Sequence, residues 1–251
     1  MPPAEALLPV TIGRSAPKRK RAPFGADFVA IPVRTPLVRA GDDVAAIVAR
    51  ATAGIAHAGD VIAVSETAVA IAQGRMIAAE TIRPSPLAYA LSRHAGALAT
   101  VSQPESLQLV IDDAGAWRVV LAALAQIAGR ALRIRGLFYR VLGSAISTID
   151  GYTGTLPPFE RTIVLGPKDP GSVAAAIAAA AGTHVAVVDA NDLGRATVLG
   201  ASPGVSVERL EAALLGNPHG NGDEQTPIVV LAWRGPGPSP LLANAPAPVR
   251  P

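Results

Sequence analysis

Residues 169–188 read DPGSVAAAIAAAAGTHVAVV, and this stretch decides the fold class. The pair Asp169-Pro170 is typical of a helix start, because proline fits the first helical position and an acidic residue is favoured before it. The alanine-rich run that follows predicts a helix to Ala181, and the apolar run at 184–188 predicts a buried strand. A helix that leads straight into a buried strand indicates a protein that mixes helices and strands.

The same mixture of elements continues on both sides of that stretch. Gly41-Asp42-Asp43 predicts the cap of a helix that ends near Gly54, and residues 73–75 predict a turn. This alternation is consistent with an α+β or an α/β fold, and the pattern alone does not separate the two. Strands are expected at residues 28–34, 60–65, 68–72, 162–165, 196–199 and 228–233, helices at 87–95, within 105–133 and at 205–215, and a β-like segment at 138–149.

The two ends of the chain differ in composition from its middle. Residues 1–23 and 235–251 are rich in Pro, Gly and Ala, which predicts flexible tails around one domain at 24–234 that can comprise two lobes. The net charge is +3, but the first 21 residues hold five basic residues against Glu5 and so carry +4, which leaves −1 for the rest. Nucleic acid is therefore not the expected partner, because only the N-terminal tail offers phosphate contacts.

Composition also excludes several kinds of site and location. The chain has no cysteine, which excludes disulfides, thiolate metal sites and a cysteine nucleophile. No apolar run approaches the ~18 residues of a membrane span, and the N-terminus lacks the apolar segment of a secretory signal. We therefore expect a bacterial-type protein of the cytoplasm, in which any metal ion is held by oxygen or imidazole ligands.

Acidic loops after predicted strands are the remaining candidates for chemistry. The chain has none of the common glycine-rich nucleotide motifs or nucleophile elbows, and its four histidines lack the spacing of a shared metal site. Three loops, at residues 148–151, 166–170 and 188–195, each place an aspartate after an apolar strand. Carboxylates beside glycines at strand ends suit divalent cations and the phosphates that these cations bridge, although each loop alone is also ordinary turn or cap chemistry.

Six short motifs occur in an order known from one family. Ile31-Pro32 with residues 38–43 (VRAGDD) resembles the opening segment of that family, residues 58–62 (AGDVI) resemble its DGDVL segment, and Gly74-Arg75 resembles its GR pair. Residues 149–150 (ID), 165–170 (LGPKDP) and 191–195 (NDLGR) resemble its GID, LLPxDP and SDTFGR segments. Over residues 28–234 the chain thus resembles the coenzyme F-420:L-glutamate ligases.

This resemblance implies a two-lobed α+β protein, usually an intertwined homodimer, that joins L-glutamate to a deazaflavin coenzyme with GTP and Mg²⁺ or Mn²⁺. In that chemistry a carboxylate is activated as an acyl phosphate and then attacked by an amine. The metal-binding positions of the family carry over to Asp150 and to Asn191, with Asp189 and Asp192 to either side of the latter. We expect the cofactor to be bound at Ile31, Pro32, Glu66, Thr67, Arg75 and Lys168.

Residues 65–75 depart from the family pattern. The family reads AQKIVSKAEGR there, whereas this chain reads SETAVAIAQGR. Thr67 and Ile71 replace two lysines placed for nucleotide phosphate, and Glu66 adds a negative charge. Lys168 is the only lysine outside the N-terminal tail, and we expect it to stand in for the lost charges. The resemblance therefore indicates a divergent branch of the family.

Two functions stay open on the sequence alone. The first is a GTP- or ATP-dependent acid–amino-acid ligase that joins L-glutamate or another amine to a carboxylate-bearing small molecule. The second is a non-catalytic relative that binds a metabolite or a partner protein. The sequence identifies neither a catalytic residue nor the substrate.

Overall fold

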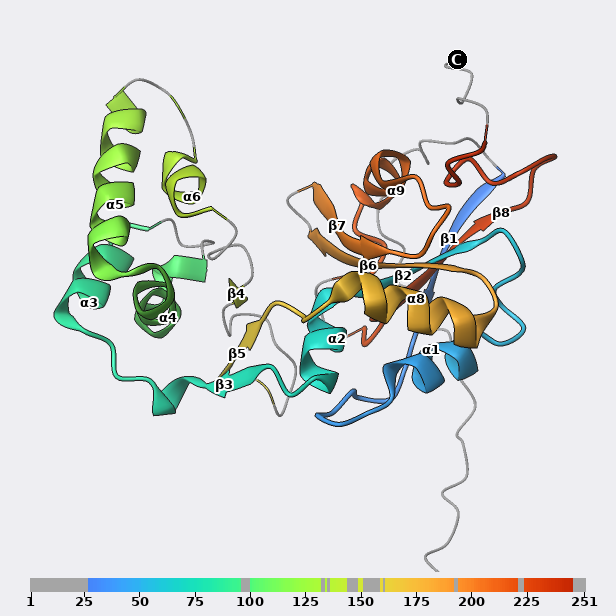
Figure 1. Cartoon of the computed structure of the whole chain (residues 1–251), viewed down its shortest axis with the longest axis horizontal. Helices are drawn as coiled ribbons and strands as arrows, with labels where there is room; N and C mark the ends of the chain where they lie inside the picture. The colour runs from blue at the N-terminus through green and yellow to red at the C-terminus, as the bar shows by residue number, and fades with distance from the viewer. Residues whose placement is uncertain are drawn as a thin grey trace, which may run out of the picture.

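The computed structural model describes residues 27–95, 100–131, 134, 136–143, 149–150, 159, 161–191, 194–220 and 224–245. Two lobes, one built around a sheet and one of helices, lie side by side with a small sheet between them (Figure 1). The five-stranded sheet has the order β1-β8-β2-β6-β7, and the small sheet has the order β3-β5-β4. The prediction of a mixed, two-lobed α+β fold is confirmed.

The sheet lobe combines segments from both ends of the chain. Its central strands, β2 and β6, are parallel, whereas β8 is antiparallel to both β1 and β2. Strands β6 and β7 form an antiparallel hairpin. The elements of this lobe are β1 (Phe28–Val33), α1 (Val44–Thr52), β2 (Val61–Ser65), α2 (Glu66–Ala72), α8 (Pro170–Ala181), β6 (His184–Asn191), β7 (Arg195–Ala201), α9 (Val207–Leu214) and β8 (Ile228–Trp233).

Alternation along β6 divides the core of this lobe into two layers. Val185 and Val187 pack with Ile177 of α8 on one face, and Ala186 and Val188 pack with Leu210 of α9 on the other. Successive side chains of a strand point to opposite faces, so a strand buried on both faces is apolar throughout. This explains why the HVAVV run predicts a strand of the sheet interior.

The helical lobe and the small sheet share a separate core. The helices are α3 (Pro86–Ser92), α4 (Pro104–Ala114), α5 (Ala116–Ala131) and α6 (Leu137–Leu142), and the strands are β3 (Met76–Ala78), β4 (Ile149–Asp150) and β5 (Thr162–Leu165). Leu107, Val110 and Val119 are buried here together with Ile163 of the small sheet. Among the described residues, none of the helices combines the length and the apolar character that crossing a membrane requires.

Two predicted helix starts are confirmed at the expected residues. Asp43 caps α1, and its side chain accepts a hydrogen bond of 3.0 Å from the Ala46 amide. Helix α8 begins at Pro170, but the Asp169 side chain makes no capping hydrogen bond. Asp169 instead adopts a left-handed backbone with φ of 45°. Its role at this position is therefore different from an ordinary cap.

The strand predicted at residues 68–72 is wrong, because this segment belongs to helix α2. Helix α2 starts at Glu66, directly after β2, and packs against β2, β5 and β6. Burial on several sides removes the polar residues whose spacing would reveal the period of 3.6. The turn predicted at 73–75 is confirmed as the helix end, where Gly74 has φ of 67°.

Three further expectations need correction. Residues 137–142 form helix α6 rather than a strand, because Phe138 and Leu142 pack into the core of the helical lobe. Residues 189–191 belong to β6 rather than to a loop. The C-terminal segment packs as far as Ala245, since Leu241 is fully buried against α9 and Arg209 Nη1 donates to the Pro240 carbonyl at 3.1 Å. The basic tail at 1–23 lies outside the described residues, and the domain boundaries stay predictions.

Candidate functional site

The carboxyl ends of the parallel strands β2 and β6 bring polar residues together. Ser65, the last residue of β2, pairs with Val188 of β6, so Glu66 and Asp189 follow paired positions. Ligands of open sheets with parallel strands bind outside this edge. Glu66 is 8% exposed and is the first residue of α2, where the helix dipole favours a negative charge.

Asp189 and Asn191 supply oxygen atoms at the same edge. Successive side chains of a strand alternate between its two faces, so Asp189 and Asn191 project from the same face of the sheet as Val185 and Val187. Burial raises the pKa of the Asp189 carboxyl, because the charged form loses its hydration. A bound cation would reverse this effect, and carboxylate and amide oxygens are suitable ligands for Mg²⁺ or Mn²⁺. These two residues therefore fit a divalent ion.

The start of α8 lies against the same sheet. A Cβ atom on Gly200 of β7 would lie 2.3 Å from the Gly171 nitrogen, so only glycine permits this close approach. The free amide groups of a helix start favour anions, and Lys168 precedes the helix by two residues with an exposed side chain. This corner of the sheet thus combines a positive helix end with oxygen ligands.

The loop that carries Lys168 is clamped to the end of α2. Gln73 Nε2 donates to the Lys168 carbonyl at 2.9 Å, and the Lys168 amide donates to Gln73 Oε1 at 2.7 Å. Arg75 Nε donates to the Gly166 carbonyl. Arg75 therefore holds the backbone of this loop, a structural role that the motif comparison alone did not predict.

His219 is a candidate that the sequence did not reveal. The Ser65 amide donates to the Pro227 carbonyl at 2.8 Å, which places the loop before β8 at the carboxyl end of β2. His219 Nδ1 lies 3.2 Å from the Thr226 carbonyl, so Nδ1 carries the proton and Nε2 holds a lone pair. Nε2 is buried and has no hydrogen-bond partner among the described residues, and burial lowers the pKa of His219 to about 4. Only the tertiary structure shows this unpaired atom.

The other predicted site residues lie at different places. Ile31 packs into the sheet-lobe core, and Pro32 is exposed on the edge strand β1, so β8 separates both from β2. Thr67 is half-buried in the first turn of α2. Asp150 lies in β4 of the small sheet, but its side chain is outside the description, as is the whole of Asp192. No three His, Asp or Glu side chains of the described residues are placed to share a metal ion.

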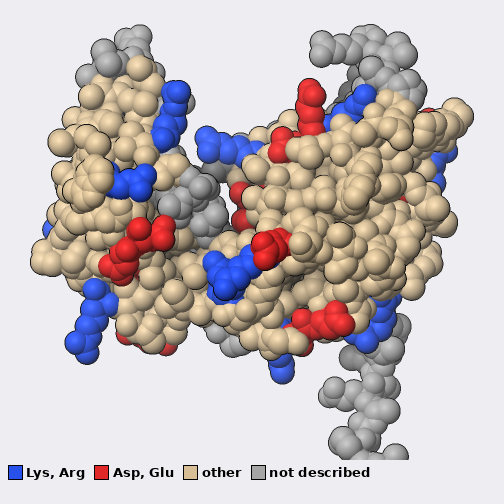
Figure 2. Space-filling view, viewed as in Figure 1, with Lys and Arg blue, Asp and Glu red and all other residues tan. Residues whose placement is uncertain are grey.

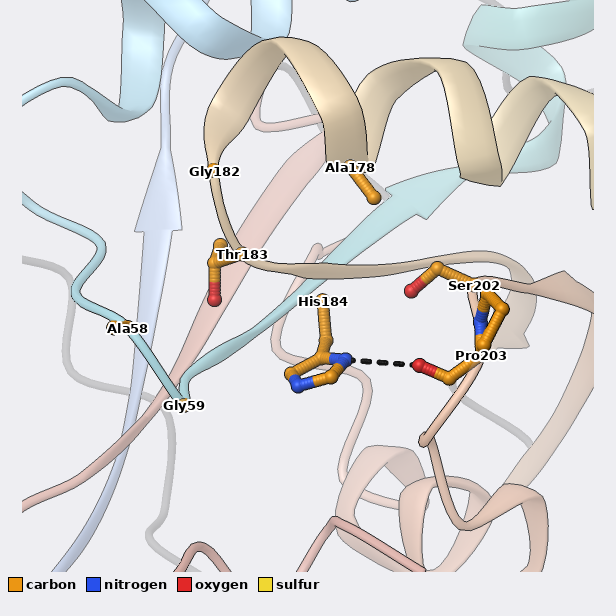
Figure 3. Close-up of a pocket in the computed structure, with 8 residues that line it drawn as sticks. All are labelled: Ala58, Gly59, Ala178, Gly182, Thr183, His184, Ser202 and Pro203. Atoms are coloured by element: carbon orange, nitrogen blue, oxygen red, sulfur yellow. Dashed lines mark hydrogen bonds between the residues drawn. The ribbon is translucent and has the colours of Figure 1, made fainter.

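A separate surface pocket lies at the opposite, amino end of β2 and β6 (Figure 3). Its volume is about 370 Å³, and its one ionisable side chain, His184, has Nδ1 3.1 Å from the Pro203 carbonyl. Figure 2 shows instead that acidic and basic side chains gather along the hollow between the two lobes. The lining residues of the pocket are Ala58, Gly59, Ala178, Gly182, Thr183, His184, Ser202 and Pro203.

Fold and site together define a two-lobed α+β protein with oxygen ligands and a positive helix end at one sheet edge. The chain belongs to the F420-0:gamma-glutamyl ligase family, whose family model matches residues 32–213. Ligases of this family use GTP and a divalent metal ion and act on small molecules. No curated protein matches the chain. The match ends within α9, so the His219 loop and β8 lie beyond it.

Proposed function

We propose that this chain is a nucleotide- and metal-dependent ligase that joins L-glutamate or another amine to a carboxylate-bearing small molecule, and that it acts as a homodimer. Family membership supports the reaction class. The observation that carries the proposal is the pairing of Ser65 with Val188, because it brings Glu66 and Asp189 to one edge beside the start of α8. Oxygen ligands and a positive helix end are the two features that a metal-bound triphosphate needs.

The reaction we propose has two steps. A carboxylate oxygen of the substrate attacks the terminal phosphorus of GTP or ATP, and the bond to the bridging oxygen breaks to release the nucleoside diphosphate. The amine nitrogen then attacks the carbonyl carbon of the acyl phosphate, inorganic phosphate leaves, and the amine loses a proton. A divalent ion, when bound, neutralises phosphate charge during the transfer.

Separate groups of residues in this chain could bind the metal ion and the phosphates. We propose that Asp189 and Asn191 hold the ion, together with Asp150 and Asp192 as the resemblance implies. The start of α8 and Lys168 are proposed to hold phosphate. Arg75 acts on the loop backbone through Gly166.

The departures in α2 favour a reaction partner other than the deazaflavin coenzyme with GTP. Ile71, which replaces a family lysine, is 8% exposed and packs with Val38 and Val164 in the core. This position thus serves packing and supplies no charge for phosphate. Together with the acidic Glu66, it also favours the second candidate, a non-catalytic relative that binds a metabolite or partner.

Nucleotide and metal titrations test the proposal. We expect GTP or ATP to bind in calorimetry only when Mg²⁺ or Mn²⁺ is present, and mass spectrometry to detect little glutamylation of the deazaflavin coenzyme. The double change Thr67→Lys and Glu66→Gln should tighten triphosphate binding about fivefold or more, because a charged contact contributes ~1 kcal/mol. Absence of nucleotide binding under all these conditions would leave the non-catalytic candidate. Efficient glutamylation by the unmodified chain would contradict the role we assign to the missing lysines.

A further inference from the structure

His219 is a buried side chain for which the ligation described above has no use. Thr226 fixes the ring, because its carbonyl lies 3.2 Å from Nδ1 and its hydroxyl donates to the His219 carbonyl. Nε2 therefore presents a lone pair, and it has no hydrogen-bond partner among the described residues. Burial lowers the pKa of His219 to about 4, so Nε2 remains an acceptor at neutral pH. A buried acceptor without a partner is costly, so a group that donates to Nε2 is expected here.

Backbone contacts place His219 at the carboxyl edge of β2. The Ser65 amide donates to the Pro227 carbonyl at 2.8 Å. Pro227 directly follows Thr226, which holds the ring of His219, and Glu66 directly follows Ser65. One backbone hydrogen bond thus joins the neighbours of His219 and of Glu66, so the two residues belong to the same edge of the sheet.

The turn between β6 and β7 lies near the start of the same segment. A Cβ atom on Gly194 would lie 4.0 Å from the carbonyl oxygen of Leu215, four residues before His219. The Gly194 amide in turn donates to the Asn191 carbonyl at 3.2 Å. The segment that carries His219 therefore begins beside the residues proposed to hold the metal ion. In the proposed ligation the amine has to meet the acyl phosphate at this place.

Two carboxylates make a cation the favoured ligand here. A Cβ atom on Gly220 would lie 2.8 Å from the carboxyl carbon of Glu224, so this carboxylate lies against the residue that follows His219. Glu66 is 8% exposed, and a carboxylate of low exposure attracts a cation more strongly than one in water. An ammonium group combines a positive charge with three N–H donors, so it suits a lone pair and a carboxylate together. A metal ion is less suitable, since no three His, Asp or Glu side chains in the described part of the chain are placed to share one.

We propose that His219 and Glu66 bind the amino group of the amine substrate, with His219 Nε2 as hydrogen-bond acceptor and the Glu66 carboxylate as the opposite charge. This amine site rests on the proposed ligation, because that reaction requires an amine. It also explains Glu66, whose charge is unfavourable for phosphate but favourable for an ammonium group. Nε2 is covered, so the amine reaches it through a local change of the backbone, which Gly216 and Gly220 on either side of His219 permit.

Nitrogen NMR of the histidine rings tests the amine site in the full chain. The ¹⁵N resonance of His219 Nε2 is identified by its loss in His219→Gln. L-glutamate or methylamine should shift this resonance toward that of a hydrogen-bonded nitrogen. Glutarate, which has the two carboxylates of glutamate without its amino group, should leave it unchanged.

His184 is the matched control for this measurement. Its Nδ1 lies 3.1 Å from the Pro203 carbonyl, and it pairs with Val61 at the opposite end of β2 (Figure 3). The Nε2 resonance of His184 should not respond to either amine. A His219 resonance that responds to neither amine, or that responds equally to glutarate, would overturn the proposal.

Two variants separate amine binding from nucleotide binding. Glu66→Gln should weaken the binding of the amine that shifts Nε2 about tenfold, because a hydrogen bond to a charged group contributes a factor of this order. It should not weaken the binding of GTP with Mn²⁺. Glu208→Gln is the matched control, since Glu208 also lies in the first turn of a helix, α9, but is exposed. This control should leave the affinity for the amine unchanged.

His219→Asn removes Nε2 but keeps a side-chain N–H that can donate to the Thr226 carbonyl. Its affinity for the amine should also fall about tenfold, while circular dichroism and GTP binding stay as in the unmodified chain. Unchanged amine affinity in this variant and in Glu66→Gln, or an equal loss in Glu208→Gln, would contradict the amine site. A chain that binds no nucleotide but still shows the Nε2 response would instead reject the ligation and leave the amine site in place.

Discussion

The two ends of the paired strands β2 and β6 each carry a carboxylate, and the surroundings of these two carboxylates differ. Asp60, at the amino end, is 2% exposed, and both its oxygens are used. Oδ1 accepts from the Trp233 amide at 3.1 Å and from Arg234 at 2.9 Å, while Oδ2 accepts from the His57 amide at 2.9 Å. At the carboxyl end of the neighbouring β6, burial raises the pKa of Asp189. Both oxygens of the carboxylate at the amino end are thus hydrogen-bonded, whereas burial disfavours the charged form of the carboxylate at the carboxyl end.

This contrast suggests a different role for each carboxylate, one in the stability of the fold and the other in binding. A buried carboxylate with a charged partner and several hydrogen bonds stabilises the fold, and its removal leaves the partners unsatisfied. A buried carboxylate whose charge is disfavoured costs stability, and such groups are candidates for functional sites. His219 is also a candidate for a functional group, because its Nε2 is buried and finds no hydrogen-bond partner in the part of the chain that the structure describes. The following predictions test whether this division between the two edges is correct.

The largest effect is expected at the amino edge. Asp60→Asn should lower the free energy of unfolding by about 3 kcal/mol, because Arg234 and the Trp233 amide lose a charged acceptor. Urea denaturation at pH 7 measures this loss. Nucleotide and metal binding should stay unchanged in the variant that remains folded. A loss of binding equal to that of a carboxyl-edge variant would contradict the division.

The pH dependence of stability should report His219. Its pKa is about 4 in the folded chain and near 6.5 in the unfolded chain, so the unfolded chain alone takes up a proton between these values. The free energy of unfolding should therefore fall by about 3 kcal/mol as the pH falls from 6.5 to 4, with no contribution above 6.5. Denaturation series at several pH values measure the slope. His219→Gln should flatten it, and an equally steep slope in this variant would assign the effect to other groups.

Asp189→Asn should have a smaller effect of the opposite sign. The raised pKa means that Asp189 contributes stability when protonated and loses it as the pH rises through the folded pKa. Since asparagine mimics the protonated acid, the variant should be more stable than the unmodified chain at pH 7. It should also lose the thermal stabilisation that Mn²⁺ gives to the unmodified chain. Equal stabilisation by Mn²⁺ in both proteins would remove Asp189 from the metal site.

The smallest effect is expected at Lys168, whose side chain is exposed. Lys168→Met should weaken triphosphate binding about fivefold, because it removes one point charge of ~1 kcal/mol near the start of α8. The fold should be unaffected, since the backbone of this residue carries the hydrogen bonds to Gln73. Calorimetric titration of both proteins gives the comparison. Unchanged affinity would show that Lys168 has no part in binding.

The candidate site could be predicted from the sequence only in part. The motifs led to Glu66, Asp189 and Lys168, which the structure places around α2, β6 and the start of α8. The metal and cofactor roles of these residues stay predictions. His219 could not be found, because a histidine that bonds a neighbouring carbonyl has no characteristic spacing in sequence. Arg75 was assigned to a cofactor, yet its Nε donates to the Gly166 carbonyl.

Local signals determined much of the fold. The HVAVV run specified an interior strand, Asp43 specified the start of α1, and Pro170 specified the start of α8. These signals act within a few residues, through hydrogen bonds to the first turn, a restricted φ angle and alternation along a strand. Six motifs in a known order were sufficient to identify the family, which the match over residues 32–213 confirms.

Tertiary structure decided what depends on distant partners. The run at 68–72 is helical because α2 lies against β2, β5 and β6, and an apolar run of this length has no period of its own. Leu241 lies in a proline-rich sequence, but it is buried because it packs against Leu210 and Leu214 of α9. Likewise, Glu66 and Asp189 lie at the same edge of the sheet only because Ser65 pairs with Val188. Strand register arises from packing across the whole sheet, and no short stretch of sequence contains it.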